Sequence, residues 1–502
     1  MHKLLWTIYG LLLLGPLALA FWSGSVQDQI ISFDDNLLGW YPRMAVDSHG
    51  KIHVVWNETL VNYPSQYEIH YSSSTDNGRT WSAMSGDIMI SFDDGIGPNN
   101  GSSIAIDSDD NIYVVWSEEN EGIDEIHYTI STNGGLTWSG QTADLILSDT
   151  GGTAALYPEI IIDQNDVIHV VWIQGWQGGA NEVYYSRSTN GGATWSSQTA
   201  ETIISYPDGQ HAIYPDIALG PNNEMLVVWR EDDDIASPRD VMNFSLSTDG
   251  GNSWSGTTAD YPITQSFSIA SYPHNVIDPD GNFHVTWWGT QSTSSPYHYE
   301  LYYSRSIDGG LIWTGNLADQ IVSYVDDANV SNPNFGVDHC GNLFAVWNEY
   351  YTGTVSEIHI SISTDCGYTW SGTLGDEIIS FPDGRPAYRP FLVAGNDDTL
   401  HATWGEGIIN NYYQIHYSRG DAICEQVPEA VDDLTITMDG NNAVLQWSEI
   451  PDAVRFNIYR SDDPGFVPTP ADSIGYTMSN TYTDPGIIET CHMKYYNVKA
   501  IY

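Results

Sequence analysis

Five carboxylates occupy the same place in a repeated pattern, two residues after a tryptophan that ends a short apolar run. They are Glu58, Glu118, Glu231, Glu349 and Glu406. Residues two apart on a strand point to the same side, so these side chains are expected to ring one end of the molecule and bind a cation or a basic or polyhydroxyl ligand. The alternative is that glutamate is the repeat consensus, satisfied by neighbouring amides. Gln174 and Gly289 interrupt the ring, which argues against a single metal cage.

Aromatic residues stand in the variable segments that follow these glutamates. The candidates for a ligand-binding face are Trp176, Tyr297, Tyr351 and Tyr413. Exposed Trp and Tyr beside carboxylates bind sugar rings by stacking and hydrogen bonding. The alternative is that these aromatics pack loop against loop.

Oxygen-rich turns such as residues 107–111 (Asp-Ser-Asp-Asp-Asn) carry ligands of the kind that calcium prefers. None has the twelve-residue loop with a terminal bidentate Glu, and Asp-x-Asp-Gly-Asn is an ordinary hairpin turn. No zinc spacing, nucleophile elbow, phosphate loop or dinucleotide fingerprint stands out. We therefore expect no metal site and no cofactor, with calcium as the one candidate to test.

The elements that position these residues are repeated strands. The tryptophans recur every 56 to 60 residues, at Trp56, Trp116, Trp172, Trp229, Trp287, Trp347 and Trp404. Each unit holds short β-branched and aromatic runs separated by Gly, Asn, Asp and Pro, which is typical of strands and turns. Several short strands per unit and a period of this length predict an all-β propeller.

A turn motif, Ser-x-(Asp/Asn)-x-Gly-x-x-Trp, follows the third strand of six units. Its Asp or Asn residues are Asp76, Asn133, Asn190, Asp249, Asp308 and Asp365. Short polar side chains can cap the turn's own amides, glycine supplies positive φ, and the tryptophan buries a large ring. The motif is therefore expected to be structural.

This motif resembles the Asp-box, or BNR repeat, of the sialidase-like superfamily, over residues 28–423. The resemblance implies a propeller whose ligand face lies opposite the boxes. Sialidases of the family clamp the substrate carboxylate with three arginines, for which the candidates are Arg43, Arg230 and Arg389. The family's Arg-Ile-Pro order is absent: residues 41–43 read Tyr-Pro-Arg and residues 388–390 read Tyr-Arg-Pro.

Six boxes accompany seven sets of the first three strands. The seventh set, residues 388–418, has neither a box nor a fourth strand. Residues 29–34 (Gln-Ile-Ile-Ser-Phe-Asp) copy the fourth strand of the sixth unit, residues 377–382. We therefore predict seven blades, the last of them closed by the N-terminal strand, which leaves no open sheet edge.

The remaining segments suggest export and a second domain. Residues 1–20 read as a secretory signal peptide; an uncleaved membrane anchor is the alternative, but Gly15-Pro16 breaks the helix where the apolar region should end. Residues 424–430 look like a linker. Residues 431–502 resemble a fibronectin type III domain through Trp447 and a late tyrosine-rich strand, with one strand fewer than expected.

The net charge limits the classes of partner, and the cysteine content indicates possible disulfides. The chain has 65 acidic and 15 basic residues, a net charge of −50, which argues against nucleic acid and anionic membranes. Four cysteines in an exported chain suggest two disulfides. Two hairpin turns at the same end of one blade favour Cys340 with Cys366, and elimination leaves Cys424 with Cys491.

Together these features predict a secreted or cell-surface propeller that recognises a glycan or an extracellular protein without catalysis. The alternative function is a sialidase-like glycoside hydrolase at the same face, and a third reading is a purely structural propeller. No membrane insertion is expected after signal cleavage.

Overall fold

The computed structural model describes residues 22–423 apart from short loop gaps, of which 233–239 is the longest, and the strands and turns found between residues 434 and 501. Residues 1–20 and 424–430, expected to be a signal peptide and a linker, lie outside the described residues. The chain divides into two compact units, Met1–Ile423 and Cys424–Tyr502. In the described parts, regular structure is almost entirely β, and no helix is long and apolar enough to cross a membrane.

The described residues of the first unit form seven antiparallel sheets of three or four strands. In chain order their strands are β2 (Gly39–Val46), β3 (Ile52–Leu60), β4 (Tyr63–Ser74) and β5 (Ile88–Met89); β6 (Ser103–Ile106), β7 (Ile112–Asn120) and β8 (Ile123–Ser131); β9 (Ala155–Ile162), β10 (Ile168–Gly175), β11 (Asn181–Ser188) and β12 (Thr202–Ile203); β13 (Ala212–Leu219), β14 (Met225–Asp232) and β15 (Asp240–Ser247); β16 (Ile269–Ile277), β17 (Phe283–Thr290), β18 (Glu300–Ser306) and β19 (Gln320–Ile321); β20 (Asn329–Val337), β21 (Leu343–Tyr350), β22 (Glu357–Ser363) and β23 (Glu377–Ile378); and β24 (Ala387–Ala394), β25 (Leu400–Ile408) and β26 (Tyr412–Gly420). Short 3-10 turns follow most third strands.

The last of these sheets takes its fourth strand from the start of the chain. β1 (Gln29–Ile30) pairs with β26, with Gln29 opposite Tyr417 and Ile30 opposite His416. The resulting order is β1-β26-β25-β24. This is the pairing expected from the sequence copy at residues 29–34.

The exchange of chain ends extends further than β1. Residues 22–24 (Trp-Ser-Gly) take in the last sheet the place that residues 370–372 (Trp-Ser-Gly) take in the sixth: the glycine amide donates to Ser418 Oγ (2.7 Å) in one and to Ser361 Oγ (2.9 Å) in the other. Trp22 is only 1% exposed and belongs to the core cluster of the last two sheets. The N-terminal segment therefore supplies the tryptophan half of a seventh turn motif that the sequence does not show.

The sheets pack face to face through their second strands. β3 is buried at every position except its last, because neighbouring sheets cover both of its faces. The tryptophans that mark the repeat, one on each second strand, are at most 1% exposed. The repeated apolar runs of the sequence are thus the core of this unit.

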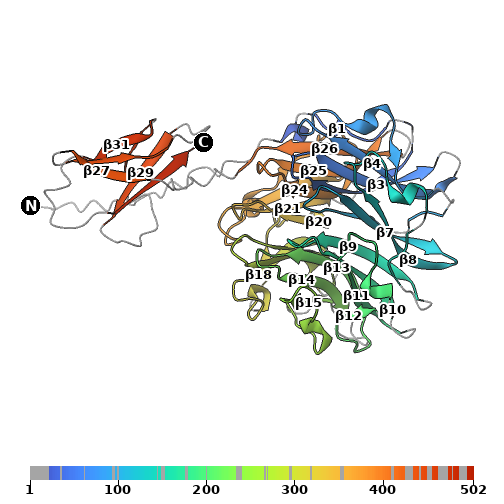
Figure 1. The fold of residues 1–502 in the computed structure, drawn as a ribbon. Helices are drawn as coiled ribbons and strands as arrows, with labels where there is room; N and C mark the ends of the chain where they lie inside the picture. Colours follow the sequence, from blue (N-terminus) through green and yellow to red (C-terminus); the bar gives the residue numbers. More distant parts are fainter. Residues whose placement is uncertain are drawn as a thin grey trace, which may run out of the picture. The chain divides into compact units, whose positions relative to one another are not determined.

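Neighbouring sheets contact one another in chain order and return to the start. The first strands β2, β6, β9, β13, β16, β20 and β24 each contact the next, and β24 contacts β2. The turns after these strands are also linked: Ser48 binds Asp110 in the following sheet, and Asn396 Nδ2 of the last sheet donates to Asp47 O of the first (2.8 Å). Figure 1 shows the last sheet (orange) beside the first (blue).

The turn motif has one geometry in all six copies. The serine hydroxyl donates to the Asp or Asn Oδ1 at 2.8–3.0 Å, and this oxygen also accepts the backbone amide four residues further on, at 2.8–3.0 Å, in the copies at Asp76, Asn133, Asn190, Asp249, Asp308 and Asp365. The Asp and Asn side chains therefore make their hydrogen bonds within their own turns. The motif is therefore a structural cap in this protein.

Each motif tryptophan joins its sheet to the preceding one. Its ring packs on an aromatic ring of the previous sheet's third strand, with centroids 5.0–5.4 Å apart, in the pairs Trp81–Tyr417, Trp138–Tyr71, Trp195–Tyr128, Trp254–Tyr185, Trp313–Phe244 and Trp370–Tyr303. The first pair joins the first sheet to the last. The six motifs are therefore connectors between sheets as well as turns.

The glycine of the motif is required by this connection. Gly251 has φ +78°, and a Cβ there would overlap the Tyr185 hydroxyl of the preceding sheet. We expect Gly251→Ala to destabilise the unit by about 3 kcal/mol, adding overpacking to positive-φ strain. Gly250, with φ +69° and open space around its Cβ position, is the matched control, and Gly250→Ala should cost about 1 kcal/mol. Thermal unfolding monitored by tryptophan fluorescence measures both; equal losses would contradict the connection.

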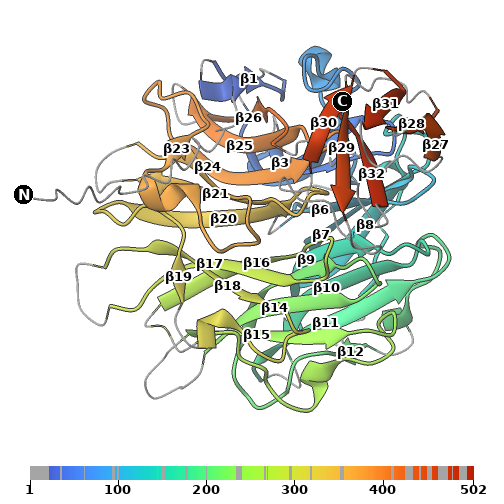
Figure 2. The same cartoon turned by 90° about the vertical axis from the view of Figure 1, so that its left-hand side faces the viewer.

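The second unit, described by itself, contains two three-stranded sheets. One has the order β27-β28-β31 and the other β30-β29-β32. Their bounds are β27 (Thr435–Asp439), β28 (Asn442–Gln446), β29 (Arg455–Ser461), β30 (Ser473–Thr477), β31 (Thr481–Asp484) and β32 (Tyr495–Ile501), seen in red in Figure 2. Trp447, Phe456, Ile458 and Val498 share a buried core. Two packed sheets agree with a small β-sandwich; membership of the fibronectin type III class stays a prediction.

The predicted Cys340–Cys366 bridge is wrong. Cys366 carries a free thiol, whereas Cys340 is disulfide-bonded. The physical reason is that the motif turn of Cys366 packs against the preceding sheet, whose Arg305 donates a hydrogen bond to the Cys366 carbonyl oxygen. Cys424 and Cys491, the second predicted pair, lie outside the described residues.

Candidate functional site

The first strands of six sheets carry a bulge at one equivalent position. The pairing with the second strand skips two residues there, for example between Trp40 and Arg43. The first skipped residue has positive φ, between 46° and 57°, at Tyr41, Tyr157, Tyr214, Tyr272, Asn332 and Arg389. A proline follows each of them. Positive φ in bulky residues costs of order 1–3 kcal/mol and is a feature of functional sites.

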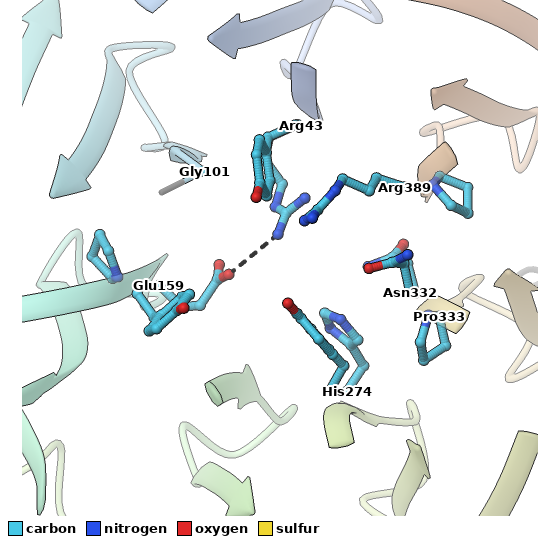
Figure 3. Close-up of a pocket in the computed structure, with 13 residues that line it drawn as sticks. Arg43, Gly101, Glu159, His274, Asn332, Pro333 and Arg389 are labelled. Atoms are coloured by element: carbon cyan, nitrogen blue, oxygen red, sulfur yellow. Dashed lines mark ion pairs between the residues drawn. The ribbon is translucent and has the colours of Figure 1, made fainter. Parts of the chain in front are cut away.

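These bulges turn side chains from different sheets into one central pocket of about 70 Å³. It is lined by Tyr41, Arg43, Gly101, Tyr157, Pro158, Glu159, Tyr272, His274, Asn332, Pro333, Asn334, Arg389 and Pro390. Figure 3 shows Arg43 and Arg389 directed toward one another, with Glu159 and His274 opposite them. The contact between the last sheet and the first makes this possible, because Arg43 lies on β2 and Arg389 on β24.

The two arginines are held differently. Arg43 Nη2 lies 3.6 Å from Glu159 Oε1, and its Nε is buried without a hydrogen-bond acceptor among the described residues. Ser103 Oγ donates to the other oxygen of Glu159 (2.7 Å). Arg389 stacks over the Tyr41 ring at 3.8 Å and has no described carboxylate within ion-pair distance. The pocket thus offers hydrogen-bond donors for an anion.

Three tyrosines form the wall beside the arginines. Tyr214 stacks on Tyr272 with centroids 4.0 Å apart and meets Tyr157 edge-on at 4.9 Å. Burial, reinforced by the hydrogen bond with Tyr214, raises the pKa of Tyr272 to about 12. Its phenol therefore keeps its proton at neutral pH. His274 lies in the same pocket lining, and its Nδ1 is 3.6 Å from Asp216 Oδ1.

A wider pocket of about 350 Å³ adjoins the first and shares Tyr41 and Arg389 with it. Its other lining residues are Trp40, Asn57, Tyr67 and Pro98. Trp40 packs on Tyr413 with centroids 4.0 Å apart. The volume lies in the range of small-molecule sites, and the lining combines aromatic rings with a few polar groups.

The sequence candidates divide between this site and other places. Arg43 and Arg389 line the central pocket, and Tyr413 supports Trp40 in the second one. Arg230 lines neither pocket: its guanidinium pairs with Asp232 (2.6 Å) and Asp240 (2.8 Å) on its own sheet. Tyr297 is 38% exposed, and Trp176 and Tyr351 lie outside the described residues.

The five glutamates do not form the acidic mouth expected from the sequence. Glu58, Glu118, Glu231, Glu349 and Glu406 are 1–5% exposed. Each accepts the indole N–H of the tryptophan two residues earlier, at 2.6–2.9 Å. The Trp and Glu side chains lie on the same side of the strand, as predicted. The hydrogen bond from the indole, however, holds the carboxylate inside the protein and away from solvent. These residues line neither arginine pocket.

Buried carboxylates give the fold a pH dependence, of which Glu182 is an example. It is 2% exposed and accepts a hydrogen bond from Ser205 Oγ (2.6 Å). Burial raises its pKa from 4.5 to about 8. Between these two pH values the folded state therefore retains a proton on Glu182 that the unfolded state releases. The contribution of Glu182 to the free energy of unfolding is fully present below pH 4.5 and is lost as the pH rises through 8.

We expect the wild type to lose on the order of 1–2 kcal/mol more stability than Glu182→Gln between pH 5 and pH 9. The amide of the variant keeps the hydrogen bond and cannot titrate. Urea unfolding at both pH values measures the difference. Parallel losses in the two proteins would show that Glu182 is ionised in the folded state.

Sequence reasoning missed the tyrosine wall, Trp40 and His274. A signal was present, because the dipeptide Tyr-Pro lies inside the first strand of four units, at residues 41–42, 157–158, 214–215 and 272–273. A proline inside a strand indicates a break in the hydrogen-bond ladder. The repeated break would have pointed to side chains turned inward at one level of the ring.

This fold and site define an all-β repeat protein with a polar pocket where its sheets meet. Residues 29–285, just over half of the 502 residues, match the model of the BNR repeat-like domain. The chain belongs to that family.

Solved structures share the fold at low sequence identity. An ulvan lyase of polysaccharide lyase family PL25 is similar with a TM-score of 0.55 and 12% identity, over 79% of this chain and 95% of that one. An alpha-L-arabinanase from Penicillium chrysogenum (TM-score 0.46, 13% identity, 79% and 98% covered) and a protein of unknown function from Dyadobacter fermentans (0.48, 14%, 79% and 98%) are also similar. No curated protein sequence matches the chain.

Proposed function

We propose that residues 22–423 form a seven-bladed Asp-box propeller whose central pocket binds the acidic group of a glycan. The blade count is supported by seven sheets in the described residues and by contacts that run from each sheet to the next and from the last to the first. The motif turns lie at the end where the first and second strands join, since Lys51 Nζ, next to one such turn, donates to Gly134 O of a motif. The pockets lie toward the other strand ends.

The observation that carries the acidic ligand is the convergence of Arg43 and Arg389. Only 15 of the 502 residues are basic, so two guanidinium groups in one small pocket are more than the average composition of the chain would place there. Like charges brought together repel unless an anion lies between them. Arg43 Nε has no acceptor among the described residues, and a planar guanidinium pairs best with a carboxylate.

A glycan is favoured by the second pocket. Trp40, Tyr41 and Tyr67 offer aromatic faces beside Asn57, which can hydrogen-bond to hydroxyl groups. An acidic sugar bound across both pockets would place its anionic group on the arginines and its ring or its neighbour on the aromatics. The similar proteins named as ulvan lyase and alpha-L-arabinanase act on glycans by their titles, which agrees with this class of ligand.

Recognition without turnover is the primary proposal. The sialidase alternative requires a third arginine, and Arg230 is engaged with Asp232 and Asp240 elsewhere. Catalysis on an acidic glycan is the second candidate, because His274 and the protonated Tyr272 flank the arginines and can exchange protons with a bound sugar.

The test is an array of immobilised glycans that contains uronate-bearing, sialylated, sulfated and neutral oligosaccharides. Binding of acidic members, and none of their neutral counterparts, would support the proposal; binding confined to neutral glycans would overturn it. The bound glycans, together with a fluorogenic sialoside, are then incubated with the protein and analysed by mass spectrometry. Cleaved products would make the protein an enzyme.

The rest of the chain completes this proposal. Residues 1–20 would direct export, residues 424–430 would be a linker, and residues 431–502 would form a fibronectin type III-like module. An exported glycan-binding propeller of net charge −50 would act outside the cell or at its surface, with a glycan or an extracellular protein as its partner.

A further inference from the structure

Three sheets repeat a buried group of one glutamate, one histidine and one aspartate. The groups are Glu58–His70–Asp87, Glu349–His359–Asp376 and Glu406–His416–Asp28. The glutamate comes from the second strand, the histidine from the third, opposite the marker tryptophan, and the aspartate from just before the fourth strand. None of these residues lines the arginine pockets.

The group at the junction of the chain ends is the most enclosed. The side chains of Asp28, Glu406 and His416 are 5%, 2% and 4% exposed. His416 Nδ1 lies 3.7 Å from Asp28 Oδ2 and 3.6 Å from Glu406 Oε2. These distances are too long for hydrogen bonds, and both ring nitrogens of His416 lack a partner among the described residues.

The carboxylates of this group are only partly satisfied. Asp28 accepts the backbone amide of Phe381 at both oxygens (2.9 and 3.1 Å), and Glu406 Oε2 accepts the Trp404 indole N–H (2.9 Å). Two carboxylates this close repel unless a proton or a cation lies between them. The side chains of Asp28 and Glu406 are hydrogen-bonded to each other, which requires a proton between them when no cation is bound.

In two sheets without the histidine, an amide side chain donates a hydrogen bond directly to a carboxylate. In the fourth sheet Asn243 takes the histidine position, and its Nδ2 donates to Glu231 Oε2 at 3.0 Å. In the third sheet Gln174 replaces the glutamate and donates to Glu201 at 3.1 Å. In the three Glu–His–Asp groups the histidine Nδ1 makes no such hydrogen bond among the described residues, so the gap in those groups is not imposed by the fold.

We propose that Asp28, Glu406 and His416 bind a divalent transition-metal ion of the zinc type, which fastens the N-terminal segment to the last sheet. One imidazole nitrogen and two carboxylates are ligands that zinc accepts. Ligands about 2.1 Å from a tetrahedral centre lie about 3.4 Å apart, so the observed 3.6 and 3.7 Å require only small movements. Asp28 precedes β1 directly, and Glu406 and His416 lie on β25 and β26. The two equivalent groups have the same chemistry.

The test compares the full chain with His416→Asn. This variant copies the natural Asn243–Glu231 arrangement, so it should fold and lose one metal site. Metal content is measured by mass spectrometry after purification without chelators and after titration of the chelator-treated protein with Zn²⁺. We expect one zinc fewer per chain in His416→Asn than in the wild type, and no loss in Glu357→Gln, a control at a nearby half-buried carboxylate that accepts a hydrogen bond from Ser380.

Hydrogen exchange of residues 22–33 locates the effect. With Zn²⁺ at 100 times its dissociation constant, exchange that requires release of this segment should slow about 100-fold in the wild type and not in His416→Asn. Equal protection in both proteins, or zinc content that the variant does not lower, would overturn the proposal. Binding of Ca²⁺ but not Zn²⁺ would overturn the assigned class of metal. Absence of any bound metal would mean that the carboxylates share a proton instead.

Discussion

Arg389→Ala is expected to weaken binding of an acidic glycan about 30- to 100-fold, the loss of one or two charge-assisted hydrogen bonds. Arg389 stacks on Tyr41 and borders both pockets, and no described carboxylate competes for it. Arg389→Lys should recover part of the affinity, because it keeps the charge and loses the planar fork. Calorimetric titration with the best acidic glycan of the array measures these differences.

Arg385→Ala is the matched control. Arg385 is close in sequence but pairs with Asp383 at 3.1 Å, is 40% exposed in its side chain, and lines neither arginine pocket. Its removal should leave affinity within about twofold, since exposed pairs contribute little. Equal effects of Arg385→Ala and Arg389→Ala would indicate a general charge effect and not a binding pocket.

Removal of residues 22–32 is expected to abolish folding of the first unit. Trp22 and Ile31 are 1% and 0% exposed, and each buried side chain of this size contributes about 2–5 kcal/mol. Their joint loss is comparable to the whole stability of a typical domain, about 5–15 kcal/mol. The shortened chain would also expose the edge of β26, which promotes association between chains.

A chain that begins at Trp22 is the control and should unfold as the full chain does. Trp22→Ala is the milder variant, expected to fold with a loss of about 3–5 kcal/mol. Size-exclusion chromatography and calorimetry distinguish these cases. A chain beginning at Phe33 that stays monomeric and unfolds at the wild-type temperature would show that the N-terminal segment is dispensable.

The repeated elements were predictable because their signals are local. Strand runs, the turn motif and the copy at residues 29–34 each lie within one stretch of sequence, and the structure places them as expected. The tryptophan half of the seventh motif was missed, although residues 22–24 repeat residues 370–372. A motif is recognised by its contiguous pattern, and here the third strand, which ends at Gly420, and the tryptophan, Trp22, lie at opposite ends of the unit.

The site was less predictable because it depends on relations between sheets. Arg43 and Arg389 were named as candidates. No local sequence pattern, however, indicates that the first and last sheets bring them together while Arg230 pairs with carboxylates elsewhere. The inward turn depends on a bulge, which the alternation of a strand does not encode. The Cys340–Cys366 error has the same origin, since neighbours within one sheet are not the nearest neighbours of a turn that leans on another.

The division of the last sheet between the two ends of the first unit has a consequence for the order of events during synthesis. Gly24 and Ser418, which share a hydrogen bond, are 394 positions apart, so the segment around Gly24 must wait for nearly the whole unit to be synthesised before its partner exists. Contacts of such separation slow folding, and unpaired strand edges invite association meanwhile. The other sheets can assemble as they emerge, but the final joint cannot form early. The last sheet can therefore be completed only after the whole first unit has been synthesised.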